Sequence, residues 1–378
     1  LAFTQEFEEF SEHFKEYQDQ ADPPTYLEAV RLIQQQWNDG KWPSDWAIKG
    51  VKGSGSVNIA VECFDRSEND SFIITVPRKD VALRSRVDFQ SIDRFLEKLT
   101  ESESGKDRYG YLLGLSRVIK QSVPLEFDRA ANFEMLDTVQ PLYNRTVNGW
   151  KVRTVEAKGI FGDAIAMGMA PGESARAIRD KNPGLYRDAM GALTQVELNV
   201  LLGIDHRNRP WPVPLPANPD LHDGQVFIDE GTKTVTFLDF GQAIHISNEQ
   251  RSTGIGLLDF LRRSADSDHA DAARALGRAM DVSVPVSEVG SILGRREPLD
   301  RFIRTIDLID KCQGEVPLPV VHWVMAINRL RSLGGEIDQS IDPTLARVLM
   351  VRGIGGSLTL HNSGRLLKLN IQSKLAVG

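Results

Sequence analysis

A chain of 378 residues is long enough to form two packed lobes, each with a hydrophobic core of its own. Its 41% hydrophobic and 26% charged residues are ordinary for a globular protein and exclude the disordered and membrane-embedded classes. A formal net charge of −7 disfavours a sequence-independent nucleic-acid binder, which needs a basic surface to neutralise phosphates. We therefore expect no nucleic-acid partner.

The two cysteines, Cys63 and Cys312, are far apart and lie outside any metal-ligand spacing. They predict neither a disulfide framework nor a zinc site, and this usage is typical of the reducing cytoplasm. No apolar run approaches the roughly 20 residues that span a bilayer. We therefore expect a cytoplasmic protein without a transmembrane segment.

The opening segment is predicted to be an acidic helix with an aromatic stripe, formed by Phe3, Phe7, Phe10, Phe14 and Tyr17. We expect the stripe to pack on the rest of the chain, with a protein partner or peripheral membrane contact as the alternative. A second helix is predicted over residues 25–37. It leads through a Gly- and Trp-containing connection to two strand-like runs, 57–64 and 71–76, whose polar connection predicts a hairpin.

The remaining elements are mostly helical. Helical patterns cover residues 88–99, 108–121 and 127–136, and residues 152–157 resemble a strand. Beyond residue 174, the β-rich runs 226–229 and 234–238 predict a second hairpin, preceded by an ordered Pro-rich loop over 210–219. This layout predicts an α+β, bilobal, protein-kinase-like fold, with a small mixed N-lobe over 1–158 and a larger, mostly helical C-lobe over 159–378.

The strongest local motif surrounds the second hairpin. Asp220 is followed five residues later by the amide of Gln225, and Asp239-Phe240-Gly241 follows the hairpin. Kinases use an acid, an amide and a second acid at this spacing to hold magnesium and to orient a nucleophile. The spacing therefore indicates phosphoryl-transfer chemistry, whereas Asp239 alone would be an ordinary acid in a turn.

A small-residue loop precedes the first strand-like run, with the sequence Lys52-Gly53-Ser54-Gly55-Ser56-Val57. Backbone amides of such a loop approach phosphates closely because no bulky side chains intervene. A plain hairpin turn is the alternative. Its position ahead of the strand pair favours a phosphate-binding loop.

These motifs occur in the order seen in the UbiB (ADCK) atypical kinase-like family, which the chain resembles over nearly its whole length. The segments that resemble the successive motifs of the family are 17–24, 54–57, 72–79, 126–128, 155–159, 219–225, 238–241, 318–319 and 341–343. The resemblance implies ATP and Mg²⁺ as cofactors. It implies that Asp220 is the catalytic acid or base and that Gln225 and Asp239 are metal ligands.

The resemblance also implies a set of nucleotide-binding residues. Glu156 is placed near the adenine hinge, and the small-residue loop over the phosphates contributes Gly53, Ser54, Gly55 and Ser56. Within the family's motif, His222 takes a structural or metal-adjacent position. Asp205-His206-Arg207-Asn208 also resembles a kinase catalytic loop and is the alternative position for that loop in this sequence.

The chain departs from the family at the lysine that grips the α- and β-phosphates, where it has Thr75. The glutamate that usually pairs with this lysine is replaced by Asn132 in one register and by Arg129 in the other. Both halves of the ion pair are therefore absent, which avoids a buried glutamate without its partner. Lys52 is the best placed substitute cation, and Lys49 and Lys79 are less well placed.

Three hypotheses about function follow. The first is a UbiB-like kinase or ATPase that binds Mg-ATP between two lobes and transfers phosphoryl to a small-molecule or lipid-like acceptor, or to water. The second is a pseudokinase that keeps the fold as a binding or scaffold module, which the replacement at Thr75 favours. The third is another transfer from ATP, such as nucleotidyl transfer.

Overall fold

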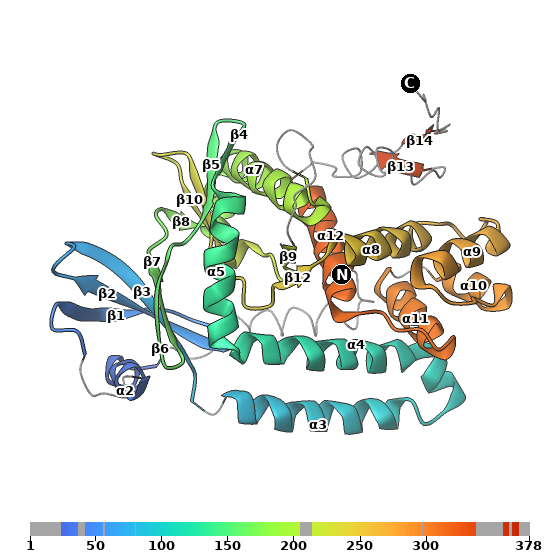
Figure 1. Ribbon diagram of the computed structural model, residues 1–378, viewed down its shortest axis with the longest axis horizontal. Coiled ribbons are helices and arrows are strands. Elements are labelled where there is room, and N and C mark those ends of the chain that lie inside the picture. Colours follow the sequence, from blue (N-terminus) through green and yellow to red (C-terminus); the bar gives the residue numbers. More distant parts are fainter. Residues whose placement is uncertain are drawn as a thin grey trace.

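The computed structural model describes residues 24–36, 42–55, 57–79, 81–204, 214–295, 298–337, 358–362 and 365–369. The fold is mixed α+β, with a sheet-rich region formed by the first part of the chain and a larger helical part beyond it (Figure 1). The predicted aromatic helix and the alternative catalytic loop at 205–208 lie outside the described residues.

The first sheet is antiparallel and has the strand order β1-β2-β3-β7-β6. Its strands are β1 (Trp46–Ser54), β2 (Asn58–Asp65), β3 (Asp70–Pro77), β6 (Ala157–Phe161) and β7 (Ala164–Gly168). Alternate residues of β3, including Phe72 and Ile74, are buried with Ala29 and Ile33 of helix α2 (Tyr26–Gln36). Because successive side chains of a strand point to opposite faces, Thr75 lies on the face away from α2.

Three helices separate β3 from the next strand. Helices α3 (Val81–Leu99) and α4 (Glu103–Phe127) lie side by side, and α5 (Arg129–Tyr143) turns away from them to contact strands of both large sheets (Figure 1). Asp128 caps α5, because its side chain accepts a hydrogen bond from the backbone N–H of Ala131 at 3.0 Å. The start of α5 is thus held next to the end of α4.

The second sheet has the strand order β4-β5-β11-β10-β8, and its pairs are antiparallel except for β5 with β11. Its strands are β4 (Arg145–Val147), β5 (Trp150–Thr154), β8 (Glu173–Ser174), β10 (Val226–Asp229) and β11 (Thr234–Phe237). Residues 169–172 connect the two large sheets. Helices α6 (Ala175–Lys181) and α7 (Pro183–Leu202) follow, and α7 carries a largely buried face into the main core.

The rest of the described chain is mostly helical and gathers at the end of the molecule away from the first sheet (Figure 1). Two short strands, β9 and β12, pair with each other and pack against α12. The elements are β9 (Leu215–Ala217), η1 (Asp223–Gln225), β12 (Ile244–Ile246), α8 (Asn248–Leu261), α9 (His269–Met280), α10 (Val286–Leu293), α11 (Pro298–Lys311), α12 (Leu318–Glu336), β13 (Leu358–Asn362) and β14 (Arg365–Leu369).

Both hairpins predicted from the sequence are confirmed, as β2–β3 and β10–β11. The predicted division after residue 158 falls inside β6, and the first sheet continues to Gly168. Residues 145–154, assigned to the first lobe, instead form strands of the second sheet. Within the described ranges, no helix is both long enough and apolar enough to cross a membrane.

Candidate functional site

The hairpin β10–β11 positions the two predicted metal ligands. Gln225 immediately precedes β10, and Asp239 follows β11 by two residues. The antiparallel register places Val226 opposite Phe237, and the N–H of Leu238 donates to the carbonyl of Gln225 at 3.0 Å. Two segments separated by the hairpin therefore end next to each other.

The side chains of Asp220, Gln225 and Asp239 meet directly. Nε2 of Gln225 donates to Oδ2 of Asp220 at 3.0 Å and to Oδ2 of Asp239 at 3.3 Å. Asn218 holds the backbone of both acids. Its Nδ2 donates to the backbone carbonyl of Asp239 at 2.8 Å, and its Oδ1 accepts from the backbone N–H of Asp220 at 3.0 Å. The sequence predicted the three meeting groups but not the positioning role of Asn218.

A small cavity lies at this junction, with a free volume of about 10 Å³, which is room for one water or one bare metal ion. Its lining residues are Glu126, Asn218, Asp220, Gln225, Asp239, Gly241 and Gln242. The cavity is much smaller than a nucleotide. It is suited to an ion held by oxygen atoms.

Glu126, at the end of α4, adds a third carboxyl group to this cavity. Burial, together with the charges of Asp239 and Asp220, raises the pKa of Glu126 to about 7, and the hydrogen bond from Nε2 of Gln242 at 2.6 Å opposes that rise. Burial also raises the pKa of Asp220, and the nearby Asp239 adds to the effect. These shifts show a water-poor site in which negative charges repel one another.

The residue types supply the oxygen donors that a magnesium ion takes, but here the NH₂ group of Gln225, and not its oxygen, faces both carboxylates. Oε1 of Gln225 is buried and has no hydrogen-bond partner, and two carboxylates lie within hydrogen-bond reach of the same amide group. Mg²⁺ prefers oxygen ligands and usually takes one or two carboxylates from the protein, with substrate phosphates completing the shell. Within the described ranges, no group of three His, Cys, Asp or Glu is arranged to hold a metal by itself.

His222 does not enter this cavity. Its Nδ1 accepts a hydrogen bond from the N–H of Gly224 at 3.1 Å, so its ring caps the 3-10 helix that ends at Gln225. This position matches the structural alternative predicted for His222.

Thr75 lies in β3 opposite Ile165 of β7, and the structure decides which residue of α5 faces it. Nη2 of Arg129 donates to Oγ1 of Thr75 at 2.6 Å and to its carbonyl at 3.3 Å. Asn132 instead donates to the carbonyl of Glu126 at 3.1 Å. Arg129, and not Asn132, is therefore the residue of α5 that contacts Thr75.

The small-residue loop joins β1 to β2. Gly53 and Ser54 end β1, the N–H of Gly55 donates to the carbonyl of Asn58 at 2.9 Å, and Nε of Arg78 donates to the carbonyl of Gly55 at 2.8 Å. The loop is thus a hairpin turn anchored from the end of β3, and Ser56 lies outside the described residues.

Lys52, the predicted substitute cation, is half exposed on β1. Its Nζ pairs with Oε2 of Glu62 at 3.5 Å, and 54% of its side chain is accessible. Lys49 pairs with the same glutamate at 3.2 Å. Neither lysine lines the small cavity.

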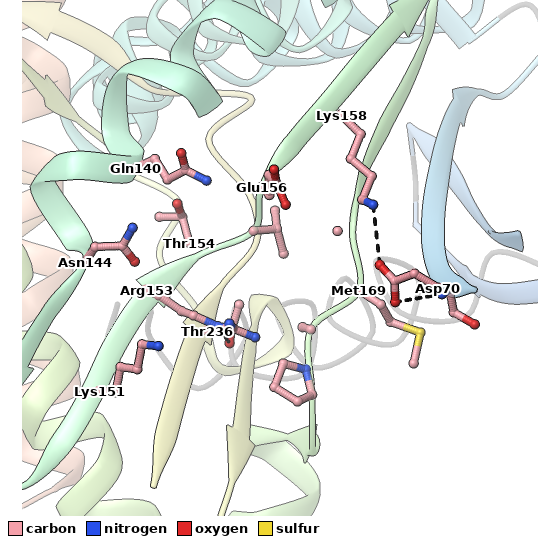
Figure 2. A pocket seen from close by; sticks show the side chains of 15 residues that line it. Asp70, Gln140, Asn144, Lys151, Arg153, Thr154, Glu156, Lys158, Met169 and Thr236 are labelled. Atoms are coloured by element: carbon pink, nitrogen blue, oxygen red, sulfur yellow. Dashed lines mark hydrogen bonds and ion pairs between the residues drawn. The ribbon is translucent and has the colours of Figure 1, made fainter. Parts of the chain in front are cut away.

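Glu156 lines a different and larger cavity of about 510 Å³, which shares no residue with the small one (Figure 2). Lys158, Met169 and Asp70 surround the same space, and Lys158 pairs with Asp70 at 3.4 Å. Nζ of Lys158 lies 6.0 Å from the ring centroid of Phe72, and Phe72 and Thr75 point to opposite faces of β3. The cavity of Glu156 is therefore on the Phe72 face of β3, whereas Thr75 is on the other face, so the Glu156 side chain is separated from the other predicted nucleotide-binding residues. The backbone carbonyl of Glu156 accepts a hydrogen bond from the N–H of Gly168, next to the connection between the sheets.

Comparison with known proteins adds no assignment. No family model matches the chain, and no curated protein matches it significantly in sequence.

Proposed function

We propose that the protein is a UbiB-like atypical kinase or ATPase that binds Mg-ATP between its two large sheets. One observation carries the proposal: Asp220, Gln225 and Asp239, which the sequence marks at kinase spacing, meet around one small oxygen-lined cavity. A structural turn needs no such convergence of two carboxylates, because they repel each other in a buried place.

The arrangement around the first sheet supports the same proposal. The small-residue loop joins the first two strands, Thr75 lies on the third strand, and α5 faces that strand. In protein kinases a glycine-rich loop covers the phosphates, the third strand carries a phosphate-gripping lysine, and a helix faces it. We therefore propose a bilobal kinase-like fold with the nucleotide between the lobes.

In this proposal the chain positions the reactants. Gln225 and Asp239 would hold Mg²⁺, which would supply positive charge to the phosphate oxygens. The carboxylate of Asp220 accepts a hydrogen bond from the attacking hydroxyl of a small-molecule or lipid-like acceptor, or from water, and aims it at the γ-phosphorus. Asn218 keeps both acids in place.

The test is calorimetric titration with ATP in the presence and absence of Mg²⁺, together with a phosphate-release assay. We expect Asp239→Asn to abolish the Mg²⁺-dependent part of ATP binding. The matched control is Asp300→Asn, which removes a half-buried carboxylate that pairs with Arg304 in α11, far from the cavity in the fold. Equal Mg²⁺ dependence in both variants would contradict the proposal.

A pseudokinase is the second candidate, and the position of Gln225 favours it. The amide nitrogen of Gln225 already satisfies both carboxylates, in the place where a metal would neutralise them. Such a protein would bind nucleotide weakly or without Mg²⁺ and would release no phosphate. ATP binding without turnover in the same assays, across candidate acceptors, would favour this function over the enzyme.

A further inference from the structure

The most unusual feature beside the candidate site is a buried arginine without an ion-pair partner. Arg129 is only 7% exposed. Its Nε donates to the carbonyl of Asp163 at 3.0 Å, and its Nη2 donates to two oxygens of Thr75. Among the described residues, no carboxylate forms an ion pair with it, and Nη1 has no partner.

A buried charge with only neutral partners is costly, because the dipoles around it replace hydration incompletely. Burial accordingly lowers the pKa of Arg129, while the charges of Asp239 and Asp163 act in the opposite direction. The carboxylate of Asp239 therefore acts on the Arg129 guanidinium without forming an ion pair with it. An anion close to Arg129 would supply the missing counter-charge.

The geometry places the first turn of α5, which carries Arg129, beside the candidate site. Asn132 lies one turn after Arg129 on α5, and a Cβ added to Gly241 would lie 3.9 Å from Nδ2 of Asn132. The same Cβ would lie 3.1 Å from Oδ1 of Asp239. The first turn of α5 therefore lies against the Asp239-Phe240-Gly241 turn, and Arg129 reaches from it to β3.

We infer that Arg129 is the phosphate-binding cation of this protein, supplied by helix α5 to the position that a lysine of the third strand occupies in other kinases. The inference rests on the proposed function and names how the same site holds the nucleotide. The usual pair has a cation on the strand and an anion on the helix. Here the strand offers the neutral Thr75 and the helix offers the cation. A guanidinium suits this task because its fork of N–H groups matches phosphate oxygens.

The inference requires binding energy that depends on phosphate groups and on the charge at position 129. We expect Arg129→Met to weaken binding of ATP and ADP by about 10- to 100-fold, the range of one hydrogen-bonded charge. Adenosine has no phosphate, so its affinity should change by less than about twofold. Arg129→Lys should retain part of the ATP affinity, which a purely structural clamp of backbone carbonyls would not predict.

A double variant tests directly whether the cation of the site has moved from the third strand to helix α5. Arg129→Glu alone should abolish ATP binding, and Thr75→Lys with Arg129→Glu should restore it to within a few fold, because the double variant rebuilds the usual pair. Lys52→Ala tests the alternative that Lys52 is the phosphate-binding cation. If Arg129 has that role, Lys52→Ala should leave ATP affinity unchanged. Thermal melting of each variant checks that it is folded.

The outcomes distinguish the role of Arg129 from the proposed nucleotide-binding function. Unchanged ATP affinity in folded Arg129→Met, or a phosphate-dependent loss in Lys52→Ala alone, would overturn the role of Arg129 and leave the proposed function standing. If Arg129→Met does not fold, failure of the double variant to recover ATP binding would overturn it. Failure of the unmodified chain to bind any nucleotide would reject the proposed function, and the inference with it.

Discussion

The amide of Gln225 lies at the centre of the candidate metal site. The kinase motif that this segment resembles has asparagine here, and the longer glutamine side chain reaches between Asp220 and Asp239 and donates to both. The NH₂ group thereby neutralises part of the repulsion that a metal would otherwise relieve. Its buried oxygen is left without a partner.

We predict that Gln225→Asn strengthens Mg²⁺ binding. The shorter amide cannot bridge both carboxylates, so the metal-free protein should melt at a lower temperature, and Mg²⁺ should stabilise it more. We expect a gain of about 1 kcal/mol in Mg²⁺ binding, or roughly fivefold in affinity, measured by calorimetry with ADP present.

The control for this change is Gln140→Asn, which shortens a glutamine that lines the larger cavity. Weaker Mg²⁺ binding in Gln225→Asn than in the unmodified chain would show that the bridging amide supports the metal site rather than competing with it.

Glu197 on α7 is a carboxyl group whose pKa is controlled by its buried surroundings. It is fully buried, it accepts a hydrogen bond from the hydroxyl of Tyr143, and its other oxygen has no partner. Burial raises the pKa of Glu197 from 4.5 to about 7. The folded protein therefore holds a proton that the unfolded chain releases between these values.

This difference predicts the sign of a pH effect. As the pH rises from 4.5 to about 7, the contribution of Glu197 to the free energy of unfolding should fall, because the unfolded state gains by ionising and the folded state does not. Glu197→Gln should remove this fall. Urea unfolding at about pH 5 and about pH 8.5 measures it, with the exposed Glu288→Gln as control. An equal pH dependence in Glu197→Gln and the unmodified chain would contradict the assignment.

At the scale of elements, the start of α5 links fold stability to the candidate site. The cap at Asp128 fixes the first turn, which carries Arg129 toward β3 and Asn132 toward the end of α4. The end of the same helix places Tyr143 5.3 Å from the ring of Phe240 in the Asp239-Phe240-Gly241 turn. One helix thus contacts both sides of the candidate site.

We predict that Asp128→Ala costs about 1 kcal/mol of the free energy of unfolding, because the backbone N–H of Ala131 loses its acceptor. It should also weaken ATP binding, since the turn that carries Arg129 frays. The matched control is Ser247→Ala, which removes the capping box of α8 at a similar cost in stability. Equal ATP affinity in the two variants would mean that the cap of α5 has no part in the site.

At the scale of the whole molecule, the short connection over residues 169–172 brings the two large sheets together. Gly172 has φ +86°, and a Cβ there would lie 2.1 Å from the carbonyl oxygen of Ile228 in β10. The connection passes so close to the second sheet that only glycine fits. This contact fixes the connection against the second sheet.

We predict that Gly172→Ala lowers the free energy of unfolding by about 3 kcal/mol or more, from both the left-handed backbone and the clash. Gly149→Ala is the matched control, because it has φ +80° in the β4–β5 turn but no atom within 4 Å of the added Cβ. It should cost roughly 1 kcal/mol. Urea unfolding compares the two, and equal losses would show that the close approach to Ile228 contributes nothing.

Local sequence signals predicted much of the secondary structure. Alternation with turn residues between the runs was enough for the hairpins β2–β3 and β10–β11, because hairpins depend on neighbouring residues. The strands β1, β6 and β7 were not predicted. β1 contains two glycines and register shifts. β6 and β7 are short; β7 pairs with the distant strand β3, and β6 pairs with β7 at the edge of the sheet.

The sequence by itself determined that Asp220, Gln225 and Asp239 meet, because their spacing around one hairpin is a local property. Only the tertiary structure decided that Glu126 and Asn218 join them, that Glu156 lines another cavity, and that Arg129 rather than Asn132 faces Thr75. Glu126, Glu156 and Arg129 lie far from Asp220 in the chain, and Asn218, although near Asp220, reaches Asp239 only through the fold. Their contacts depend on how α4, α5 and the two sheets pack, and no local pattern of residues carries that information.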